Sequence, residues 1–191
     1  MVTFKKISKL LEEEYPAYSH IYVDLVNNND SILDHLNDNF YKIKKFIYSL
    51  PLKNLAYRYA EGKWTIKEVL VHLIDTERIY TYRALRYARN DSTALHAIGQ
   101  DSYSTSSEAN ERSLESIFDE YEAVRRATLL LFQNLPDKAL VRRGGILDPN
   151  GKVIYERTAR SLAYHIAGHE LHHLKIIKEK YLKKSIEDKI I

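Results

Sequence analysis

Hydrophobic residues recur every three or four positions along much of the chain, a spacing typical of amphipathic helices. The first clear stripe follows Ser31, one of the residue types that cap helix N-termini. It ends before Pro51, a residue that does not continue a helix. Its members are Leu36, Phe40, Ile43, Ile47 and Leu50. The pattern therefore predicts a long helix over residues 31–50 with one face in a core.

Two more helices are predicted downstream. Thr65 and Glu68 have the spacing of a capping box, so a second helix should begin at residue 65. Its apolar face consists of Val69, Leu73, Tyr80, Ala84 and Tyr87. A third helix is expected over residues 112–135, ending before Pro136. The polar residues 90–110 between these two helices show no clear period, so a long loop is expected there.

The fourth helix is predicted to open near Thr158 and to include residues 161–178, where apolar side chains again recur at helical spacing. A Pro-Asn-Gly turn signal at residues 149–151 lies between two short apolar runs. We expect a small hairpin or an extended loop there. Four helices of this length pack naturally as a bundle, so the predicted fold class is all-α, a four-helix bundle.

The length and composition agree with this fold. A chain of 191 residues can bury the core of one domain, which we expect to span residues 1–191. Within it, residues 1–30 are expected to form an N-terminal arm and residues 31–183 the helical bundle. Only 6 Gly and 4 Pro are present, so few residues interrupt helices. The absence of Cys excludes disulfides, thiolate metal sites and cysteine nucleophiles.

Charge and hydropathy limit the expected partners. The net charge is only +3, and basic residues are interleaved with acidic ones, so no nucleic-acid partner is expected. The sequence has no apolar run of about 18 residues, so we expect no membrane-spanning segment. The N-terminus lacks the apolar core of a signal peptide, and a cytoplasmic protein is therefore expected.

Half of the eight histidines lie within nine residues of the predicted fourth helix: His165, His169, His172 and His173. Residues four apart share a helix face, so His169 with His173, or His165 with His169, could chelate one metal ion. A single helical histidine is more often structural. Four of them shift the balance toward metal binding, because a core would have to satisfy every polar ring.

A further histidine lies on the second helix. His72 sits at the edge of the apolar stripe, and a bundle can bring it against His169 and His173. Three protein ligands with a position left open are typical of a catalytic rather than a structural metal site. Neutral imidazoles suit Zn, Ni, Fe or Cu. Polar residues that could line an adjoining cavity are Arg83, Asp101 and Tyr103.

Residues 169–173 also fit H-E-x-x-H, the helix of zinc metallopeptidases, in which the glutamate activates a water. The extended motif fails, because Ile176 replaces its glycine and Glu179 its third histidine. Downstream, the chain has no further histidine and only Glu187 and Asp188 as distant acidic alternatives. The peptidase hypothesis is therefore the weaker one, although Glu170 stays a candidate general base.

Two segments carry a resemblance to a known family. KWTIKEVLVHLIDTERIYTYRAL and SLAYHIAGHELHHLKIIKEKY resemble the DinB/YfiT-like superfamily, over about residues 32–181. The resemblance implies a four-helix bundle that binds a divalent metal ion, most often Zn or Ni, through three histidines. Carried over to this sequence, the metal ligands are His72, His169 and His173. The alternative pair of His165 and His169 matches the family pattern less well.

The resemblance implies several activities. Some members are thiol-dependent S-transferases or isomerases that use a low-molecular-weight thiol such as bacillithiol or mycothiol, and others are described as hydrolases. We expect a small-molecule substrate and a homodimer. A thiol or a water could be the nucleophile. Two alternatives stay open: a non-catalytic, stress-associated metal-binding bundle, and a helical interaction protein without a metal.

Overall fold

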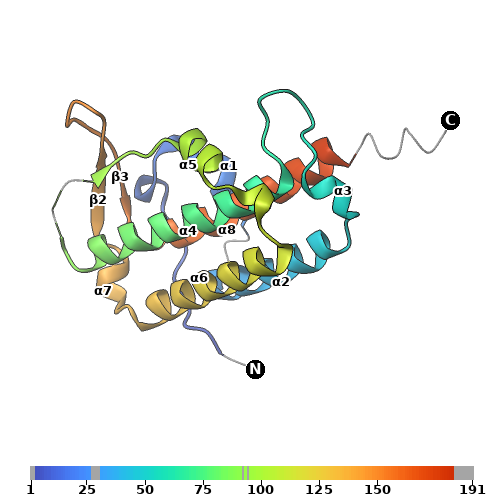
Figure 1. Ribbon diagram of the computed structural model, residues 1–191. Coiled ribbons are helices and arrows are strands. Elements are labelled where there is room, and N and C mark those ends of the chain that lie inside the picture. The colour runs from blue at the N-terminus through green and yellow to red at the C-terminus, as the bar shows by residue number, and fades with distance from the viewer. Residues whose placement is uncertain (1–2, 27–30, 92, 94, 183–191) are drawn as a thin grey trace.

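Four long helices form the body of the protein, in a computed structural model that describes residues 3–26, 31–91, 93 and 95–182. They are α2 (Ile32–Tyr48), α4 (Ile66–Ala88), α6 (Leu114–Asn134) and α8 (Ala159–Ile176). Both α2 and α4 pack against α6 and against α8, which makes a four-cornered bundle (Figure 1). The predicted four-helix bundle is confirmed. Within the described residues, no helix is long and apolar enough to cross a membrane.

The helix starts are set by local side-chain hydrogen bonds. The hydroxyl of Thr65 accepts from the backbone N–H of Glu68 at 3.1 Å, and the Glu68 carboxylate accepts from the N–H of Thr65 at 2.7 Å. This is the predicted capping box, which satisfies two backbone donors at the start of α4. The hydroxyls of Ser113 and Thr158 cap α6 and α8 in the same way.

Shorter elements surround the bundle. The helical ones are η1 (Glu12–Glu14), η2 (Ala17–Ser19), α1 (His20–Val23), α3 (Leu52–Leu55), α5 (Gln100–Ser106), η3 (Ala109–Glu111), α7 (Asp137–Leu140) and the π-helix η4 (Ile177–Tyr181). The strands are β1 (Leu95–His96), β2 (Arg143–Leu147) and β3 (Val153–Thr158). β2 and β3 pair antiparallel, so the expected hairpin is present, and β1 adds to β2 in parallel. This small sheet is a minor addition at one end of a mostly helical protein (Figure 1).

The segment 90–110 differs from the expected loop. It contains β1, α5 and η3. The strand β1 is held by pairing with β2, which lies far along the chain, and α5 packs against α4. Such tertiary contacts decide the structure of short polar segments whose local sequence shows no period.

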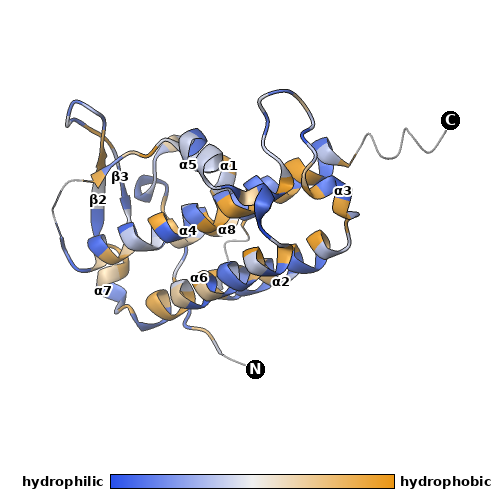
Figure 2. Cartoon of the chain, in the orientation of Figure 1, coloured by the Kyte–Doolittle hydropathy of each residue, from blue (hydrophilic) through white to orange (hydrophobic). Residues whose placement is uncertain are grey.

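Buried apolar side chains form two clusters along the bundle axis. One cluster lies toward the sheet and includes Leu36, Tyr87, Phe132 and Leu162, and the other includes Phe40, Leu70, Phe118 and Ile177. Figure 2 shows that the bundle helices carry both hydrophobic and hydrophilic residues, as amphipathic helices do.

A layer of buried polar residues separates the two clusters; we call it the polar layer. Its members come from all four bundle helices: Asn39, Glu77, Tyr121, Arg125 and Glu170. The Arg125 guanidinium donates to both oxygens of Glu77, at 2.9 and 2.8 Å, and also to Glu170. Tyr121 donates to Glu170 as well. Burial of these charges is tolerated because each is paired and hydrogen-bonded.

The short helix α1 from the N-terminal part of the chain packs on α8. Every residue of α8 from Ala159 to Glu170 is buried. At Gly168 the backbone of α1 approaches so closely that an added Cβ would lie 2.0 Å from the carbonyl oxygen of Tyr22. Nearer the start of the arm, the Arg160 guanidinium donates to Glu14 at 2.9 and 2.6 Å. Residues 1–2 and 27–30 of the expected arm and residue 183 of the expected bundle lie outside the described residues.

Candidate metal centre

Three histidine side chains converge between α4 and α8. Nε2 of His72 lies 3.1 Å from Nε2 of His169, and Nε2 of His173 lies 3.0 Å from the same atom. Within the described residues these three form a group that could hold a metal ion, with all ligand atoms within 4.8 Å of one another. The structure thus brings together the three histidines named from the sequence.

Helix geometry explains this convergence. His169 and His173 lie one turn apart, so their rings are neighbours on one face of α8. His72 comes from the first third of α4, which packs along α8. Trp64, one residue before the N-cap of α4, lies against this cluster, with ring centroids 4.7 Å from His72 and 6.4 Å from His173. The indole thus limits the freedom of both rings.

The two distances from His169 fit neighbouring ligands of a single ion. Two ligand nitrogens at about 2.0–2.1 Å from one ion lie about 2.9–3.4 Å apart when the angle between the bonds is about 90–109°. The observed 3.0 and 3.1 Å lie within this span. A bound ion would suit the three ring nitrogens better than hydrogen bonds among them, because one ring nitrogen offers either one N–H or one lone pair. Nε2 of His169, however, faces two other nitrogens.

The electrostatics keep the three rings neutral, which is the form that binds metals. Burial lowers the pKa of His72 to about 4 and, together with the neighbouring His72 and His172, lowers the pKa of His173 to about 3. Burial first, and then the other histidines, hold the pKa of His169 well below its usual range. At neutral pH no proton has to leave before an ion can bind.

The other two histidines of α8 lie beside this group. The Nδ1 atom of His165 is 3.3 Å from the Ser19 hydroxyl, and its ring centroid is 5.9 Å from that of His169. His172 is half-buried, and its ring packs edge-on against Tyr22 at 5.3 Å. For the pair of His165 and His169, the alternative considered from the sequence, the structure places only His169 in the three-histidine group.

Glu170 faces the polar layer. One carboxylate oxygen accepts from Tyr121 and Arg125, and the other accepts from Asn39 Nδ2 at 3.3 Å. In a zinc metallopeptidase the corresponding glutamate faces the water beside the metal. The two histidines of the H-E-x-x-H motif therefore lie as they do in a zinc metallopeptidase, but its glutamate does not. Glu187 and Asp188 lie outside the described residues.

Two cavities adjoin the three-histidine group. One, of about 220 Å³, has His173, Trp64 and Asp101 in its wall. The other, of about 230 Å³, has His169 and Arg83 in its wall. Two of the polar residues expected from the sequence, Arg83 and Asp101, thus line these cavities, whereas Tyr103 is 47% exposed and lines neither. The group can be approached from two sides.

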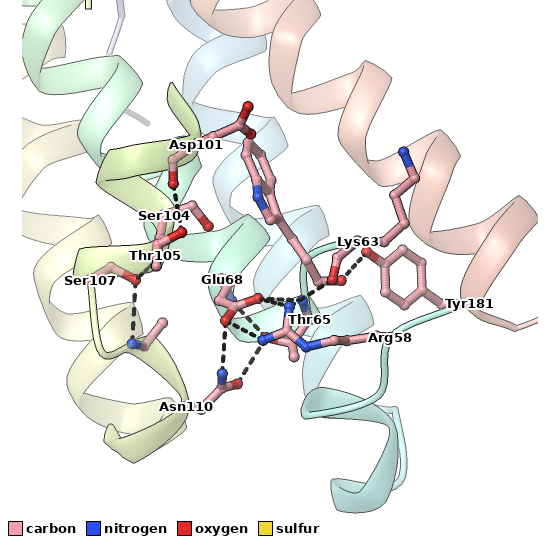
Figure 3. A network of polar contacts seen from close by, with 12 residues as sticks. Arg58, Lys63, Thr65, Glu68, Asp101, Ser104, Thr105, Ser107, Asn110 and Tyr181 are labelled. Carbon is pink, nitrogen blue, oxygen red and sulfur yellow. Dashed lines mark hydrogen bonds and ion pairs between the residues drawn. The ribbon is translucent and has the colours of Figure 1, made fainter. Parts of the chain in front are cut away.

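A polar network holds the segment that carries Trp64 (Figure 3). Arg58 donates twice to Glu68, at 2.7 Å to each oxygen, and Asn110 donates to the same carboxylate at 2.9 Å. The Tyr181 hydroxyl, from η4, donates to the backbone carbonyl of Trp64 at 2.5 Å. Contacts from three parts of the chain therefore fix this wall of the centre.

Sequence reasoning missed Trp64 and Tyr22 as neighbours of the histidines. The Tyr22 ring lies 4.5 Å from His165 and 5.3 Å from His169, between ring centroids. The single Trp of the chain, directly before a capping box, was an available signal for Trp64. For Tyr22 the sequence held none, because its position depends on the docking of the arm at Gly168.

Comparisons with known proteins identify the fold and the family of the chain. YfiT from Bacillus subtilis, described as a probable metal-dependent hydrolase with an unusual four-helix bundle topology, shares the fold with a TM-score of 0.66. The match covers 90% of this chain and 93% of YfiT at 16% sequence identity, so it is evidence for the fold alone. No curated protein matches the chain significantly. The model of the DinB superfamily matches residues 36–177, and the chain therefore belongs to the DinB superfamily.

Proposed function

We propose that this protein is a metal-dependent enzyme in which His72, His169 and His173 hold one divalent ion, Zn or Ni. The convergence of the Nε2 atoms carries the proposal, because those of His72 and His173 lie 3.1 and 3.0 Å from that of His169, the spacing of neighbouring ligands of one ion. YfiT, which shares the fold, is described as a probable metal-dependent hydrolase, and this supports the same class here.

A catalytic role is favoured over a purely structural one by the surroundings of the histidines. Three protein ligands leave at least one position for a water, a thiol or a substrate, and a cavity adjoins the group on each side. When bound, the ion would supply Lewis acidity, which lowers the pKa of a coordinated water or thiol toward neutrality.

The side chains of this protein would then perform two tasks. The neutral imidazoles would orient the ion, and the rings of Trp64 and Tyr22, which contact His72 and His169, would hold those imidazoles in place. Glu170 does not serve as the base in this proposal, because its carboxylate is bound by Arg125, Tyr121 and Asn39. Its role is to position α8 within the bundle.

The direct test is metal analysis of the untagged protein and its histidine variants. We expect one ion per chain in the wild type, and its loss in His169→Ala and in His173→Ala without loss of helicity. His172→Ala is the matched control, because this residue lies on the same turn and outside the group; it should retain the ion. Added Ni²⁺ should also quench the fluorescence of Trp64, the single Trp of the chain, which contacts His72.

Failure of this test has a clear form. If the wild-type protein takes up neither Zn²⁺ nor Ni²⁺, the metal proposal is wrong and the three histidines have a structural role. If the ion binds but no ester or thiol-transfer substrate is turned over, the non-catalytic metal-binding bundle is the better description. Hydrolysis that needs no thiol would assign water as the nucleophile, whereas strict dependence on a low-molecular-weight thiol would assign an S-transferase.

The proposal also includes a small-molecule substrate, a homodimer and a cytoplasmic location. The cavities of about 220 and 230 Å³ suit a small molecule rather than a polypeptide. Exposed apolar side chains such as Leu130 on α6 offer contacts for a second copy. Sedimentation at micromolar concentration should give a dimer, and a monomer would remove that part of the proposal.

A further inference from the structure

The cavity beside His169 has an unusual wall. It is lined by aromatic and basic groups, among them Tyr18, Tyr80, Tyr155, Arg83 and His165. Its volume is about 230 Å³, and the described residues that line it include no Asp or Glu. Phenolic hydroxyls and a guanidinium are hydrogen-bond donors, so this wall offers donors and positive charge.

Two buried arginines lie at this wall without a carboxylate partner among the described residues. Arg83 is 5% exposed and donates a hydrogen bond to the backbone carbonyl of His96 at 3.1 Å. Arg157 is 2% exposed and donates to the hydroxyls of Ser19, at 2.7 Å, and Tyr18, at 3.1 Å. The Nε atom of Arg157 is buried and has no hydrogen-bond partner within the described part of the chain.

The other deeply buried arginines of the described residues, unlike Arg83 and Arg157, have carboxylate partners. Arg125 pairs with Glu77 and Glu170, and Arg160 pairs with Glu14. A buried cation that lacks a counter-charge is costly, so the usual solution is the one adopted at those two positions. At Arg83 and Arg157 the negative partner is missing from the described part of the protein.

Aromatic rings partly compensate for this. The Arg157 guanidinium lies 5.7, 5.5 and 5.5 Å from the ring centroids of Tyr18, Tyr80 and Tyr155, directly behind the cavity wall. Arg83 lies 5.4 Å from the Tyr80 ring and reaches the cavity itself. Cation–π contacts stabilise a cation without neutralising it. The positive charge of both groups therefore stays available to an anion in the cavity.

We propose that this cavity binds a small organic anion, a carboxylate with a flat unsaturated or aromatic body, with its carboxylate toward Arg83. The planar guanidinium matches a carboxylate, and the tyrosine rings suit a flat body. His169 lies in the same wall, so the other end of the ligand would face the three-histidine group. That this anion is the substrate rests on the proposed function, whereas the binding itself needs no metal.

Benzoate is a suitable probe, and its neutral isostere benzamide is the matched ligand. Calorimetric titration of the chelator-treated protein should show benzoate binding at least about 10-fold more tightly than benzamide, since charge-assisted pairs are about twice as strong as neutral ones. Arg83→Gln should abolish this preference and Arg83→Lys should keep part of it. Arg126→Gln, which removes an exposed arginine of α6, should change nothing. Inorganic phosphate should compete weakly, and tighter binding of phosphate than of benzoate would overturn the carboxylate assignment.

Equal affinities for benzoate and benzamide in the wild type would overturn the proposal, as would an unchanged benzoate affinity in a folded Arg83→Gln protein. If Arg83→Gln does not fold, the ratio of the wild-type affinities for benzoate and benzamide alone tests the proposal. Repeating the titration with metal-loaded protein separates this inference from the proposed function. Benzoate binding without any metal uptake would support the anion site and refute the metal centre. Metal uptake without a preference for benzoate over benzamide would support the metal centre and refute the anion site.

Discussion

Burial determines the chemistry of each histidine in the candidate centre. A solvent-exposed imidazole has a pKa of about 6.5, but burial brings that of His72 to about 4 and that of His173 to about 3. The same residues would be half-charged in an unfolded chain at slightly acidic pH. Their ligand character is therefore a property of the folded protein, not of the residue type.

A pH dependence of stability follows for the metal-free protein. Because the folded-state pKa values of His72 and His173 lie below the unfolded value of about 6.5, the unfolded state binds more protons as the pH falls. The free energy of unfolding should thus be largest above pH 7 and should decrease as the pH falls from about 6.5 toward 4, by on the order of 3 kcal/mol for His72. Urea unfolding of the chelator-treated protein at several pH values measures this.

The control for that experiment is His72→Gln, which cannot be protonated at this position. Its stability should fall less steeply between pH 7 and pH 5 than that of the wild type. Equal slopes in the two proteins would show that His72 is not held neutral by burial.

Residue patterns predicted which three histidines converge better than they predicted the surroundings of those histidines. His169 and His173 could be paired because a helix places residues four apart on one face. The third ligand, His72, came from its place at the edge of a stripe and from the family resemblance. The partners of Glu170 could not be predicted, because Arg125 and Asn39 reach it from other helices across the core.

At the scale of elements, the backbones of α1 and α8 approach each other closely beside the centre. Gly168 has no side chain, and only for that reason can the carbonyl oxygen of Tyr22 lie where a Cβ would be. The Tyr22 ring is thereby placed over His165, His169 and His172. One small residue thus couples the arm to the candidate centre.

Gly168→Ala tests this coupling, because the contact determines whether the substitution raises or lowers the free energy of unfolding. In an unobstructed helix the substitution would stabilise by about 0.5–1 kcal/mol. Here the methyl group would collide with the backbone of α1, so we expect a loss on the order of 1–3 kcal/mol. Hydrogen exchange should also accelerate in residues 17–23. An increase in stability without faster exchange would show that the arm is not held as described.

Elements with a strong period were predicted well, and elements held by distant partners were not. The four bundle helices, the capping box and the hairpin have local signals. The strand β1 and helix α5 have none, since β1 depends on Ile146 and Leu147 of β2 and α5 depends on α4. The same reason explains why Arg157 was not singled out, because its neighbours Ser19 and Tyr18 lie far from it in sequence.

At the scale of the whole molecule, the polar layer joins all four bundle helices through one guanidinium. Arg125 donates to Glu77 on α4, to Glu170 on α8 and to the backbone carbonyl of Leu36 on α2. Paired burial of this kind contributes little net stability against an apolar core, but it penalises any packing that separates the partners. The layer therefore favours one register of the four helices.

Arg125→Met should accordingly destabilise the whole bundle. Removal of the guanidinium leaves Glu77 and Glu170 buried without a counter-charge, which costs about 3–5 kcal/mol. Chemical denaturation measures the change. The neighbouring Arg126→Met is the control, because Arg126 is exposed on the outer face of α6 and should alter stability by no more than about 0.5 kcal/mol. Similar effects of the two substitutions would contradict the role of the layer.

Ion binding should stabilise the molecule as a whole, since the proposed ligands come from two different bundle helices. A ligand that binds only the folded state stabilises it by about 2.7 kcal/mol at a free concentration 100 times its Kd. We therefore expect Zn²⁺ or Ni²⁺ to raise the Tm of the wild type and to leave that of His173→Ala unchanged. A Tm that rises equally in both proteins would point to binding elsewhere.

The separation of the histidines along the chain has a consequence for biosynthesis. His72 and His169 are 97 residues apart, and α8 is the last of the four bundle helices to leave the ribosome. Because chains emerge from the N-terminus first, the nascent chain presents His72 long before its partners exist. The complete site can form only when α8 docks between the arm and the bundle. An ion bound at the proposed site would therefore be acquired late, by chains whose bundle has already closed, and unfolded chains would not compete for it.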